Sequence, residues 1–403
     1  MIAVDEALEI LRAACPPGNA EAVPLGEASG RILARPIVSD VDWPPFDTSA
    51  MDGYAVRAGE LAADGASLSE RPGLVAAGDR PPAPLGRGEA VRVMTGAPIP
   101  EGTDAIVPVE EAVRENGRLA TRDRSRPRQG DHVRRRAESI AAGTTLVPAG
   151  ERLSPAAVAL AALGGADPVA VRRQPRIAIA VTGSELVPAS ARPGPGQLRD
   201  SNGPMLAALC AASGRSAATR PAVADEDGAV ARLFREAGRS EDVLITSGGV
   251  SAGDLDLLPD EAARAGFEIL FHRVAMRPGR PAAFGRRGDT FWFGLPGNPV
   301  SASVVFHLFV RYALDCLEGV ARPGAPRRRA RLTRDVALRG RRETYRDARL
   351  EATEDGGLAV EPLDSLGSHD LAAHTRANAL IRIPADTDGA SAGAVVECLA
   401  LER

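Results

Sequence analysis

Lysine is absent from this 403-residue chain, and aromatic residues make up only 3% of it. All 49 basic residues are therefore arginines, and with 53 Asp and Glu residues the formal net charge is −4. A chain without a basic excess lacks the electrostatic footprint of a nucleic-acid-binding protein. So few aromatic residues also argue against a stacking platform for single strands. We therefore expect no nucleic-acid partner.

Cysteines and long apolar runs are scarce as well. The four cysteines, Cys15, Cys210, Cys316 and Cys398, are widely spaced and form no CxxC pair. This spacing argues against a disulfide framework or a zinc site and fits a reducing cytoplasm. No apolar run reaches about 18 residues, so we expect no membrane span. The N-terminus, MIAVDEALEILRAA, predicts an amphipathic helix and not a signal peptide.

The length of the chain predicts two to four domains. Residues 4–14 place Val4, Leu8 and Leu11 on one face of a helix. The Pro44-Pro45 pair blocks helix formation and marks a boundary. After it, short apolar runs with many Gly and Pro residues, such as EAVRVMTGAPIP, predict a β-rich domain.

A second helix is expected to begin at Ser154-Pro155 and to end at Gly164-Gly165. We expect it to pack against the N-terminal helix. Residues 1–42 and 134–172 would then form one discontinuous, elongated domain, interrupted by the β-rich domain at 43–133.

Residues 173–322 alternate strands and helices, which predicts a doubly wound α/β domain with helices on both faces of its sheet. Ligands on such sheets bind beyond the carboxyl ends of the strands. The expected strands are RIAIAVTG and residues 216–223, 242–247, 268–274 and 282–293, and the expected helices are SNGPMLAALCAASG, capped by Ser201 or Asn202, and residues 226–237, 256–265 and 301–318.

The remaining residues, 323–403, predict a small all-β C-terminal domain after a linker at Pro323 to Arg327. Turn residues separate its five apolar segments. The segments are RRARLTRDVAL, ETYRDARLEAT, GLAVEPL, ANALIRIP and AVVECLAL.

The stretch from Val243 to Ser303 carries the strongest chemical signal. A buried strand at 243–247 ends in Ser247-Gly248-Gly249, which Gly253 and the carboxylates Asp254 and Asp256 follow. Paired glycines let the backbone approach a ligand, and their exposed amides hold phosphate oxygens. A tight connection with solvated charges is the alternative interpretation.

Two further pieces favour a ligand site over that alternative. Arg273, Arg277 and Arg280 supply positive charge, and Pro296-Gly297-Asn298-Pro299 forms a turn that leads into a helix. Together with the glycine loop, they indicate a site for an anionic, phosphorylated ligand with a divalent cation.

Five stretches together resemble the molybdopterin molybdenumtransferase family, which is related to the C-terminal part of gephyrin. The resemblance implies an elongated discontinuous first domain, a β-rich second, an α/β third that binds the pterin and a small β-barrel fourth. It also implies a homodimer with its active site near the subunit contact. The stretches are PPFDTSAMDGYAVR at 44–57, MTGAPIPEGTDAIVPVE at 94–110, TGSEL at 182–186, TSGGVSAGDLD at 246–256, and RPGRPAAFG with GLPGNPVSAS at 277–303.

The resemblance implies a reaction as well. Adenylylated molybdopterin and molybdate would be the substrates, AMP would leave, and molybdenum would end on the two pterin sulfurs with the help of Mg²⁺. Expected partners are a molybdopterin-adenylylating enzyme and molybdoenzyme apoproteins. Both substrates are oxyanions, which fits arginines and backbone amides, and Mg²⁺ prefers oxygen ligands.

The resemblance assigns roles to residues of this chain by their place in the matching motifs. Each carboxylate and hydroxyl has a local alternative as a turn, cap or solvated loop residue. The implied catalytic residues are Asp52, Thr95, Glu185, Asp225 and Asp256, with Glu185 and Asp256 as metal ligands. The implied substrate-binding residues are Ser247, Gly248, Gly249, Ser251, Gly253, Arg273, Arg277, Arg280, Pro296, Gly297, Asn298 and Pro299, with Arg346 and Ser368 reaching towards the partner subunit's site.

The chain departs from the family pattern in two places. Lysines are usual where this chain has Arg273 and Arg277, and arginine keeps the charge but presents a planar fork. The family usually has RGEDI where this chain has RAESI, so that Ala137 replaces a glycine and Ser139 a functional aspartate. Glu138 is a conceivable substitute, although its side chain should project differently.

Two other functions remain open at this point. One is adenylyl transfer to molybdopterin, which related single-domain α/β proteins perform, although the extra domains argue against it. The other is a catalytically weakened paralogue that binds molybdopterin as a pathway scaffold, which the replacement at Ser139 favours.

Overall fold

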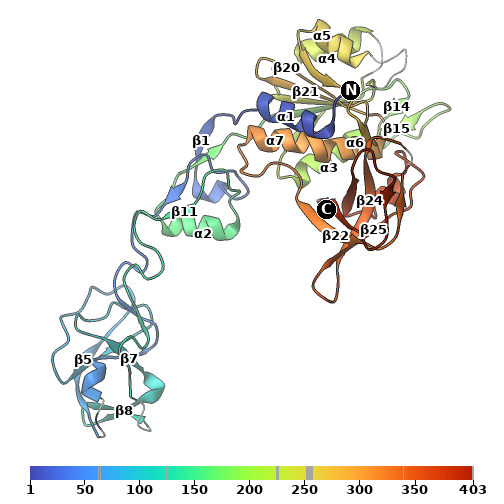
Figure 1. Cartoon of the computed structure of the whole chain (residues 1–403). Helices are drawn as coiled ribbons and strands as arrows, with labels where there is room; N and C mark the ends of the chain where they lie inside the picture. Colours follow the sequence, from blue (N-terminus) through green and yellow to red (C-terminus); the bar gives the residue numbers. More distant parts are fainter. Residues whose placement is uncertain are drawn as a thin grey trace.

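The computed structural model describes residues 1–61, 63, 65–122, 126–223, 227–250, 257–338 and 340–401. Figure 1 shows a bent, elongated molecule. An all-β body with strands β5, β7 and β8 forms one end, and an α/β sheet and a β-barrel lie side by side at the other. A stalk of two antiparallel segments, residues 37–49 and 133–147, joins the two ends.

A six-stranded sheet with the order β16-β13-β17-β21-β20-β18 forms the centre of the larger end. The first four strands run parallel, and β20 runs antiparallel to both of its neighbours, β21 and β18. Every residue of β13 and β17 is buried, as expected for a parallel sheet covered on both faces. The strands are β13 Ile177–Val181, β16 Ala217–Thr219, β17 Val243–Ser247, β18 Glu268–His272, β20 Ala283–Arg287 and β21 Thr290–Leu295.

Helices cover both faces of this sheet, which confirms the doubly wound prediction. One face packs against α1, α3, α6 and α7, and the other packs against α4 and α5. The helices are α1 Val4–Ala14, α3 Asn202–Ala212, α4 Asp227–Glu236, α5 Leu258–Arg264, α6 Pro299–Val305, a π-helical segment Phe306–Val310 and α7 Arg311–Leu317.

Two boundaries differ from the predicted ones. The single strand expected at 282–293 is a hairpin of β20 and β21, because Gly288 turns the chain at φ +58°. The helix expected at 301–318 begins at Pro299, since proline fits the first turn of a helix. Pro299–Leu317 is long and apolar enough to cross a membrane, but 94% of its apolar window is buried inside the protein. It is therefore the central core helix.

The expected packing between the first two long helices was wrong. Helix α1 buries Val4, Ala7 and Leu11 in the core of the α/β sheet, whereas α2, Pro155–Leu163, packs in a separate cluster. Strand pairing joins the two segments instead, because β1 pairs with β12 and β2 with β11. These strands are β1 Ala20–Val23, β2 Ile37–Val38, β11 Thr145–Val147 and β12 Val169–Arg172.

The distal end is a six-stranded sheet with the order β7-β4-β6-β5-β9-β8, as the β-type signals predicted. In the stalk, β3 Thr48–Ser49 pairs with β10 Val133–Arg134. The strands of the distal sheet are β4 Gly53–Val56, β5 Leu68–Val75, β6 Glu89–Val93, β7 Ala105–Pro108, β8 Ala112–Glu115 and β9 Arg118–Thr121.

The C-terminal strands close into a barrel because β24 pairs with both β25 and β26. All five expected segments form strands of it. The short strand β19, Met276–Arg277, leaves the α/β part and pairs with β24, which brings Arg277 to the barrel. The barrel strands are β22 Arg327–Leu332, β24 Glu343–Ala352, β25 Leu358–Pro362, β26 Ala379–Ile383 and β28 Val395–Ala400.

Several short elements were not predicted from the sequence. Parallel strands β14 and β15 project near the carboxyl edge of the large sheet. A single-turn helix, α8, lies in the barrel loop before β26. These elements are β14 Leu186–Val187, β15 Leu198–Arg199, β23 Val336–Ala337, β27 Gly389–Ala390, α8 Leu371–His374 and three 3₁₀ turns, Leu25–Glu27, Ala58–Leu61 and Val109–Glu111.

Candidate active-site cleft

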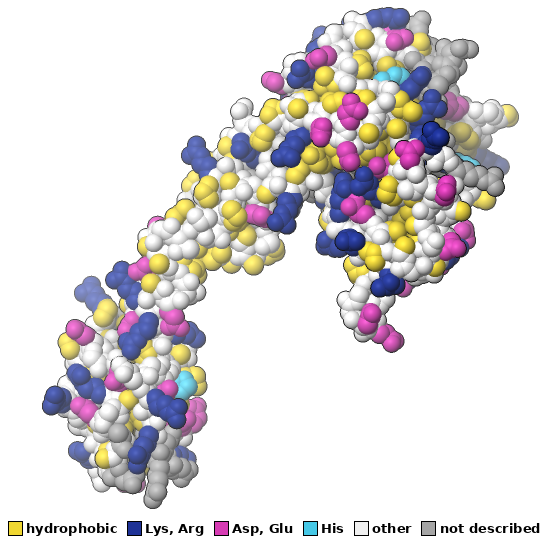
Figure 2. All heavy atoms as spheres, in the orientation of Figure 1, with side chains coloured by type: hydrophobic (Ala, Val, Ile, Leu, Met, Phe, Trp, Pro, Cys, Tyr) yellow, Lys and Arg dark blue, Asp and Glu magenta, His cyan; other side chains and the backbone are white. Residues whose placement is uncertain are grey.

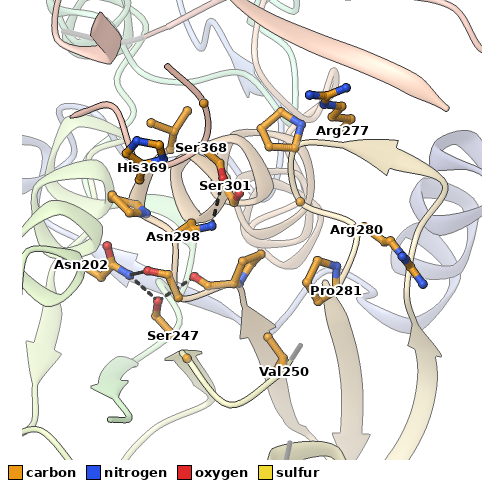
Figure 3. A pocket seen from close by; sticks show the side chains of 18 of the residues that line it. Asn202, Ser247, Val250, Arg277, Arg280, Pro281, Asn298, Ser301, Ser368 and His369 are labelled. Atoms are coloured by element: carbon orange, nitrogen blue, oxygen red, sulfur yellow. Dashed lines mark hydrogen bonds between the residues drawn. The ribbon is translucent and has the colours of Figure 1, made fainter. Parts of the chain in front are cut away.

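A cleft of about 1260 Å³ lies between the carboxyl edge of the parallel sheet and the barrel. Its walls come from the ends of β13, β17 and β21, from residues 276–281, and from β24 and the loop at 365–369. Figure 3 shows part of this lining. The cleft thus occupies the place where doubly wound sheets bind ligands.

The glycine loop begins where β17 ends. Gly248 has φ +102°, and a Cβ there would lie 2.3 Å from the carbonyl oxygen of Thr182. Any side chain would clash, so the backbone at this point is necessarily bare. The hydroxyl of Ser247 donates to the carbonyl of Pro296 at 3.0 Å. The loop and the Pro-Gly-Asn-Pro turn are thereby held together.

Asn202 connects these two segments, a role that sequence analysis missed. Its Nδ2 donates to the Ser247 hydroxyl at 2.8 Å and to the Gly297 carbonyl at 2.7 Å, as Figure 3 shows. Its Oδ1 is buried and has no hydrogen-bond partner in the described part of the chain. We expected Asn202 or Ser201 to cap α3; Ser201 is the cap residue, and Asn202 is the first residue of the helix. No motif in the sequence pointed to this role, because Asn202 and the two segments it joins are far apart along the chain.

Among the described residues, five arginines and three carboxylates line the cleft. Arg277 and Arg280 are exposed and make no ion pair within the described residues. Arg273 lies outside the lining, and its carbonyl accepts from the Ile2 amide at 3.2 Å. Sequence analysis missed two of the arginines because neither lies in a motif. The lining residues are Arg199, Arg277, Arg280, Arg342 and Arg346, with Glu185, Asp200 and Asp347.

Glu185 is the described carboxylate best placed to hold a metal ion. Glu185 is exposed at the cleft, and its carboxylate accepts no hydrogen bond from the described residues. No group of three or more metal-ligating side chains occurs in the described ranges. Asp225, Ser251, Gly253 and Asp256 lie outside the described residues. One carboxylate nevertheless fits Mg²⁺, which keeps several waters and uses substrate phosphates as ligands.

The barrel wall reaches the Pro-Gly-Asn-Pro turn of the same chain. Asn298 Nδ2 donates to the Ser368 hydroxyl at 2.9 Å, and the Val300 amide donates to the Ser368 carbonyl at 3.1 Å. Arg346 lines the same cleft, 3.8 Å from Asp364. Arg346 and Ser368 both line the cleft of their own chain, and their expected reach towards the partner subunit's site stays a prediction.

Asp52 and Thr95 lie together beside strands β4 and β6 of the distal sheet and are not among the residues that line this cleft. The amide and the hydroxyl of Thr95 each donate to Asp52 Oδ1 at 2.8 Å. These two bonds, the amide first, lower the pKa of Asp52 below its ordinary value. The exposed carboxylate is thus charged and oriented, but the fold of one chain does not bring it to the arginines.

Comparisons with known proteins cover nearly the whole chain. Residues 2–165 match the model described as "MoeA N-terminal region (domain I and II)", residues 178–315 match "Probable molybdopterin binding domain", and residues 329–401 match "MoeA C-terminal region (domain IV)". A protein named molybdopterin molybdenumtransferase 2 from Mycobacterium tuberculosis is 37% identical over 92% of both chains. The chain belongs to the molybdopterin molybdenumtransferase family.

Two further relatives agree with this assignment. The molybdopterin molybdenumtransferase of Bacillus subtilis is 34% identical and covers 100% of this chain and 94% of its own. A crystal structure of a molybdopterin biosynthesis protein from Pyrococcus horikoshii superposes with a TM-score of 0.83 at 30% identity and covers 100% of both chains. The likeness therefore extends to the arrangement of all parts of the chain.

The segment that departs from the family pattern lies in the stalk. Ala137 keeps φ +60°, a conformation typical of glycine, which explains why a glycine is usual there. Ser139 is exposed, and its amide donates to the Trp43 carbonyl at 3.1 Å. The Glu138 carboxylate accepts from the Arg135 amide at 2.6 Å within the same turn. It therefore folds back on the stalk and does not replace an aspartate at 139.

Proposed function

We propose that this chain inserts molybdenum from molybdate into adenylylated molybdopterin and releases AMP. The main support for this proposal is the cleft at the carboxyl edge of the sheet, because it combines a glycine loop whose backbone is accessible with five arginines. Both substrates are oxyanions, and such groups bind backbone amides and guanidinium groups. A cationic substrate would be repelled by the excess of arginines in this lining.

Different residues of the site bind different parts of the substrates. The backbone at Ser247, Gly248 and Gly249 binds the diphosphate, together with Ser251 and Gly253. The arginines of the cleft neutralise the diphosphate and molybdate, and bidentate guanidinium pairing orients them. The turn from Pro296 to Pro299 shapes the pterin side of the site. Asp225, Asp52 and Thr95 complete the catalytic set.

Mg²⁺ is part of the proposal, and Glu185 with Asp256 would hold it. When bound, the ion neutralises charge on the leaving phosphate and polarises the phosphorus. The exposed carboxylate of Glu185, which has no ion-pair partner among the described residues, supports this role. The side chains of the cleft exclude bulk water from the substrate and fix its orientation.

A homodimer is the second part of the proposal. Asp52 and Thr95 lie beside strands of the distal sheet and outside the cleft of their own chain, and in the proposed dimer the second copy supplies them. The stalk exposes Val38 (45%), Val41 (42%), Trp43 (45%) and Phe46 (39%), and Figure 2 shows hydrophobic side chains on its surface. Exposed apolar surface of this kind is typical of an interface. We place the enzyme in the cytoplasm, between an adenylylating enzyme and molybdoenzyme apoproteins.

The serine at position 139 favours a competing function. In that case the chain would be a catalytically weakened paralogue that binds molybdopterin without processing it. The exposed hydroxyl of Ser139 cannot act as a metal ligand or as an acid–base group in the way an aspartate does. If the loss matters, Ser139→Asp should raise the rate of AMP release.

Incubation of the purified protein with adenylylated molybdopterin, molybdate and Mg²⁺ distinguishes the two functions. We expect AMP release that depends on molybdate and that slows in Glu185→Ala at low Mg²⁺. Tight pterin binding without AMP release would contradict the enzymatic function and favour the paralogue.

A further inference from the structure

Three buried polar side chains connect the barrel to the helix behind the cleft. His374 in α8 places Nδ1 2.8 Å from Asp347 Oδ1 in β24 and Nε2 2.8 Å from Ser303 Oγ in α6. The exposed fractions of the side chains of His374 and Asp347 are 12% and 5%, and Ser303 is 2% exposed. With Nδ1–H donating to the carboxylate, Nε2 accepts from the serine hydroxyl.

Each end of this chain of hydrogen bonds continues into a wall of the cleft. Asp347 itself lines the cleft on the barrel side. Ser303 lies on the helix that begins with the Pro-Gly-Asn-Pro turn. His374 follows the loop at 365–370, whose Asp370 caps α8 through a bond from the Ala373 amide at 3.0 Å. The histidine therefore joins the loop that carries Ser368 to the helix that carries the turn.

The geometry has the order of a Ser-His-Asp triad, but the serine has no access to a substrate. Ser303 lies inside α6, is 2% exposed and is absent from the cleft lining. A nucleophile has to reach the reacting atom, so a covalent role for Ser303 is ruled out by its burial. The remaining role is structural: the hydrogen bonds of His374 fix the distance between the barrel and helix α6.

We propose that His374 is a positioning residue for anion binding in the cleft. It holds the barrel loop at 365–370 against the start of α6, and thereby keeps the Ser368 contacts with Asn298 and Val300 in register. This inference rests on the proposed function of the cleft as an oxyanion site. It adds a residue that does not touch the substrate and that no motif contains.

The test compares His374→Met, Ser303→Ala and the double variant with the wild-type protein. Methionine keeps an unbranched apolar volume and removes both hydrogen bonds. We expect KM for adenylylated molybdopterin to rise about 2- to 10-fold, the equivalent of one net hydrogen bond, with kcat nearly unchanged. The double variant should be no worse than the worse single one, because both remove the same connection. Thr375→Ala, an exposed change at the end of α8, is the control and should behave as wild type.

Amide exchange and pyrophosphate affinity give readouts that do not need turnover. The Val300 amide, which donates to Ser368, should exchange faster in His374→Met and Ser303→Ala, and calorimetry should show weaker binding of inorganic pyrophosphate. If wild-type protein releases no AMP, the proposed function fails while these two readouts still decide the role of His374. Unchanged KM, exchange and affinity in folded His374→Met would overturn the inference, and so would labelling of Ser303 by a fluorophosphonate.

Discussion

At the scale of a single residue, Gly248 decides whether the backbone at the end of β17 can reach a ligand. Its φ of +102° and the 2.3 Å approach of a virtual Cβ to the Thr182 carbonyl leave no room for a side chain. The paired glycines in the sequence predicted a bare backbone at this position, and the structure confirms it. The supporting bonds from Asn202 could not be predicted, since they join segments that only the folded sheet brings together.

Gly248→Ala should therefore disable the cleft. A Cβ at this position has to push the loop away from Thr182, and a displacement of about 1 Å lowers turnover by about 100-fold. Gly228→Ala in α4 is the matched control, because no atom lies within 4 Å of its virtual Cβ. AMP release measured for both variants tests the prediction. Wild-type rates in Gly248→Ala would remove the glycine loop from the mechanism.

Ala137 offers a test of backbone strain in the stalk. A left-handed conformation costs a non-glycine residue about 1–2 kcal/mol, and glycine loses about 0.5–1 kcal/mol more backbone entropy on folding. Ala137→Gly, at φ +60°, should therefore stabilise the protein by about 0.5–1 kcal/mol. Thermal unfolding measures the effect, with Ala141→Gly in the same stalk as a control that should destabilise. A lower melting temperature for Ala137→Gly would contradict the argument.

At the scale of elements, apolar patterning was sufficient for the type and order of most strands and helices. Short continuous runs such as IAIAV and VLITS, rich in β-branched residues, favour buried strands of a covered sheet, and the structure confirms both. The partners of elements were harder to predict. The apolar face of α1 could pack against any apolar surface. The sequence therefore did not show that α1 packs against the core of the α/β sheet and not against α2. The barrel closes where β24 pairs with β26. This pairing depends on the register of the two strands, which the sequences of five separate segments do not show.

The core helix contains a buried histidine that predicts a pH dependence of stability. Burial first, and then the positive charges of Arg311 and His374, lower the pKa of His307 to about 3. The unfolded chain therefore binds a proton at higher pH than the folded one, and stability falls as the pH drops from about 6.5 towards 3. His307 Nδ1 also has no hydrogen-bond partner in the described part of the chain.

His307→Leu should make acid destabilisation shallower between pH 6.5 and 3. At pH 7 the variant should be as stable as wild type or more stable, because an unsatisfied buried nitrogen is removed. Urea unfolding at pH 7, 5 and 4 measures both effects, and His369→Leu, which removes an exposed ring, is the control. An unchanged pH profile would show that His307 does not contribute to acid unfolding.

At the scale of the whole molecule, the stalk separates the two halves of the proposed site. Sequence motifs identified Asp52 and Thr95 as well as the glycine loop. A motif does not show, however, how far apart these residues lie in the folded chain. The fold places the two groups at opposite ends of one chain (Figure 1). Two copies that meet along their stalks would solve this problem, since each would offer its distal end to the cleft of the other.

Mixed dimers test this arrangement. Asp52→Ala and Gly248→Ala should each be inactive alone, whereas dimers assembled from an equal mixture should recover about a quarter of wild-type activity. Half of such dimers are mixed, and each mixed dimer contains one intact site of two. Activity after co-refolding or co-expression is the readout. No recovery, with mixed dimers demonstrated by mass spectrometry, would place each complete site within one chain.

In the proposed reaction, this cleft couples AMP release to molybdenum insertion. A single-turnover experiment with adenylylated molybdopterin, molybdate and Mg²⁺ measures AMP and pterin-bound molybdenum in the same sample. We expect equal amounts of both products in wild-type protein, and both products to form about 100-fold more slowly in Gly248→Ala. AMP release without bound molybdenum, or tight pterin binding with neither product, would contradict the proposed reaction.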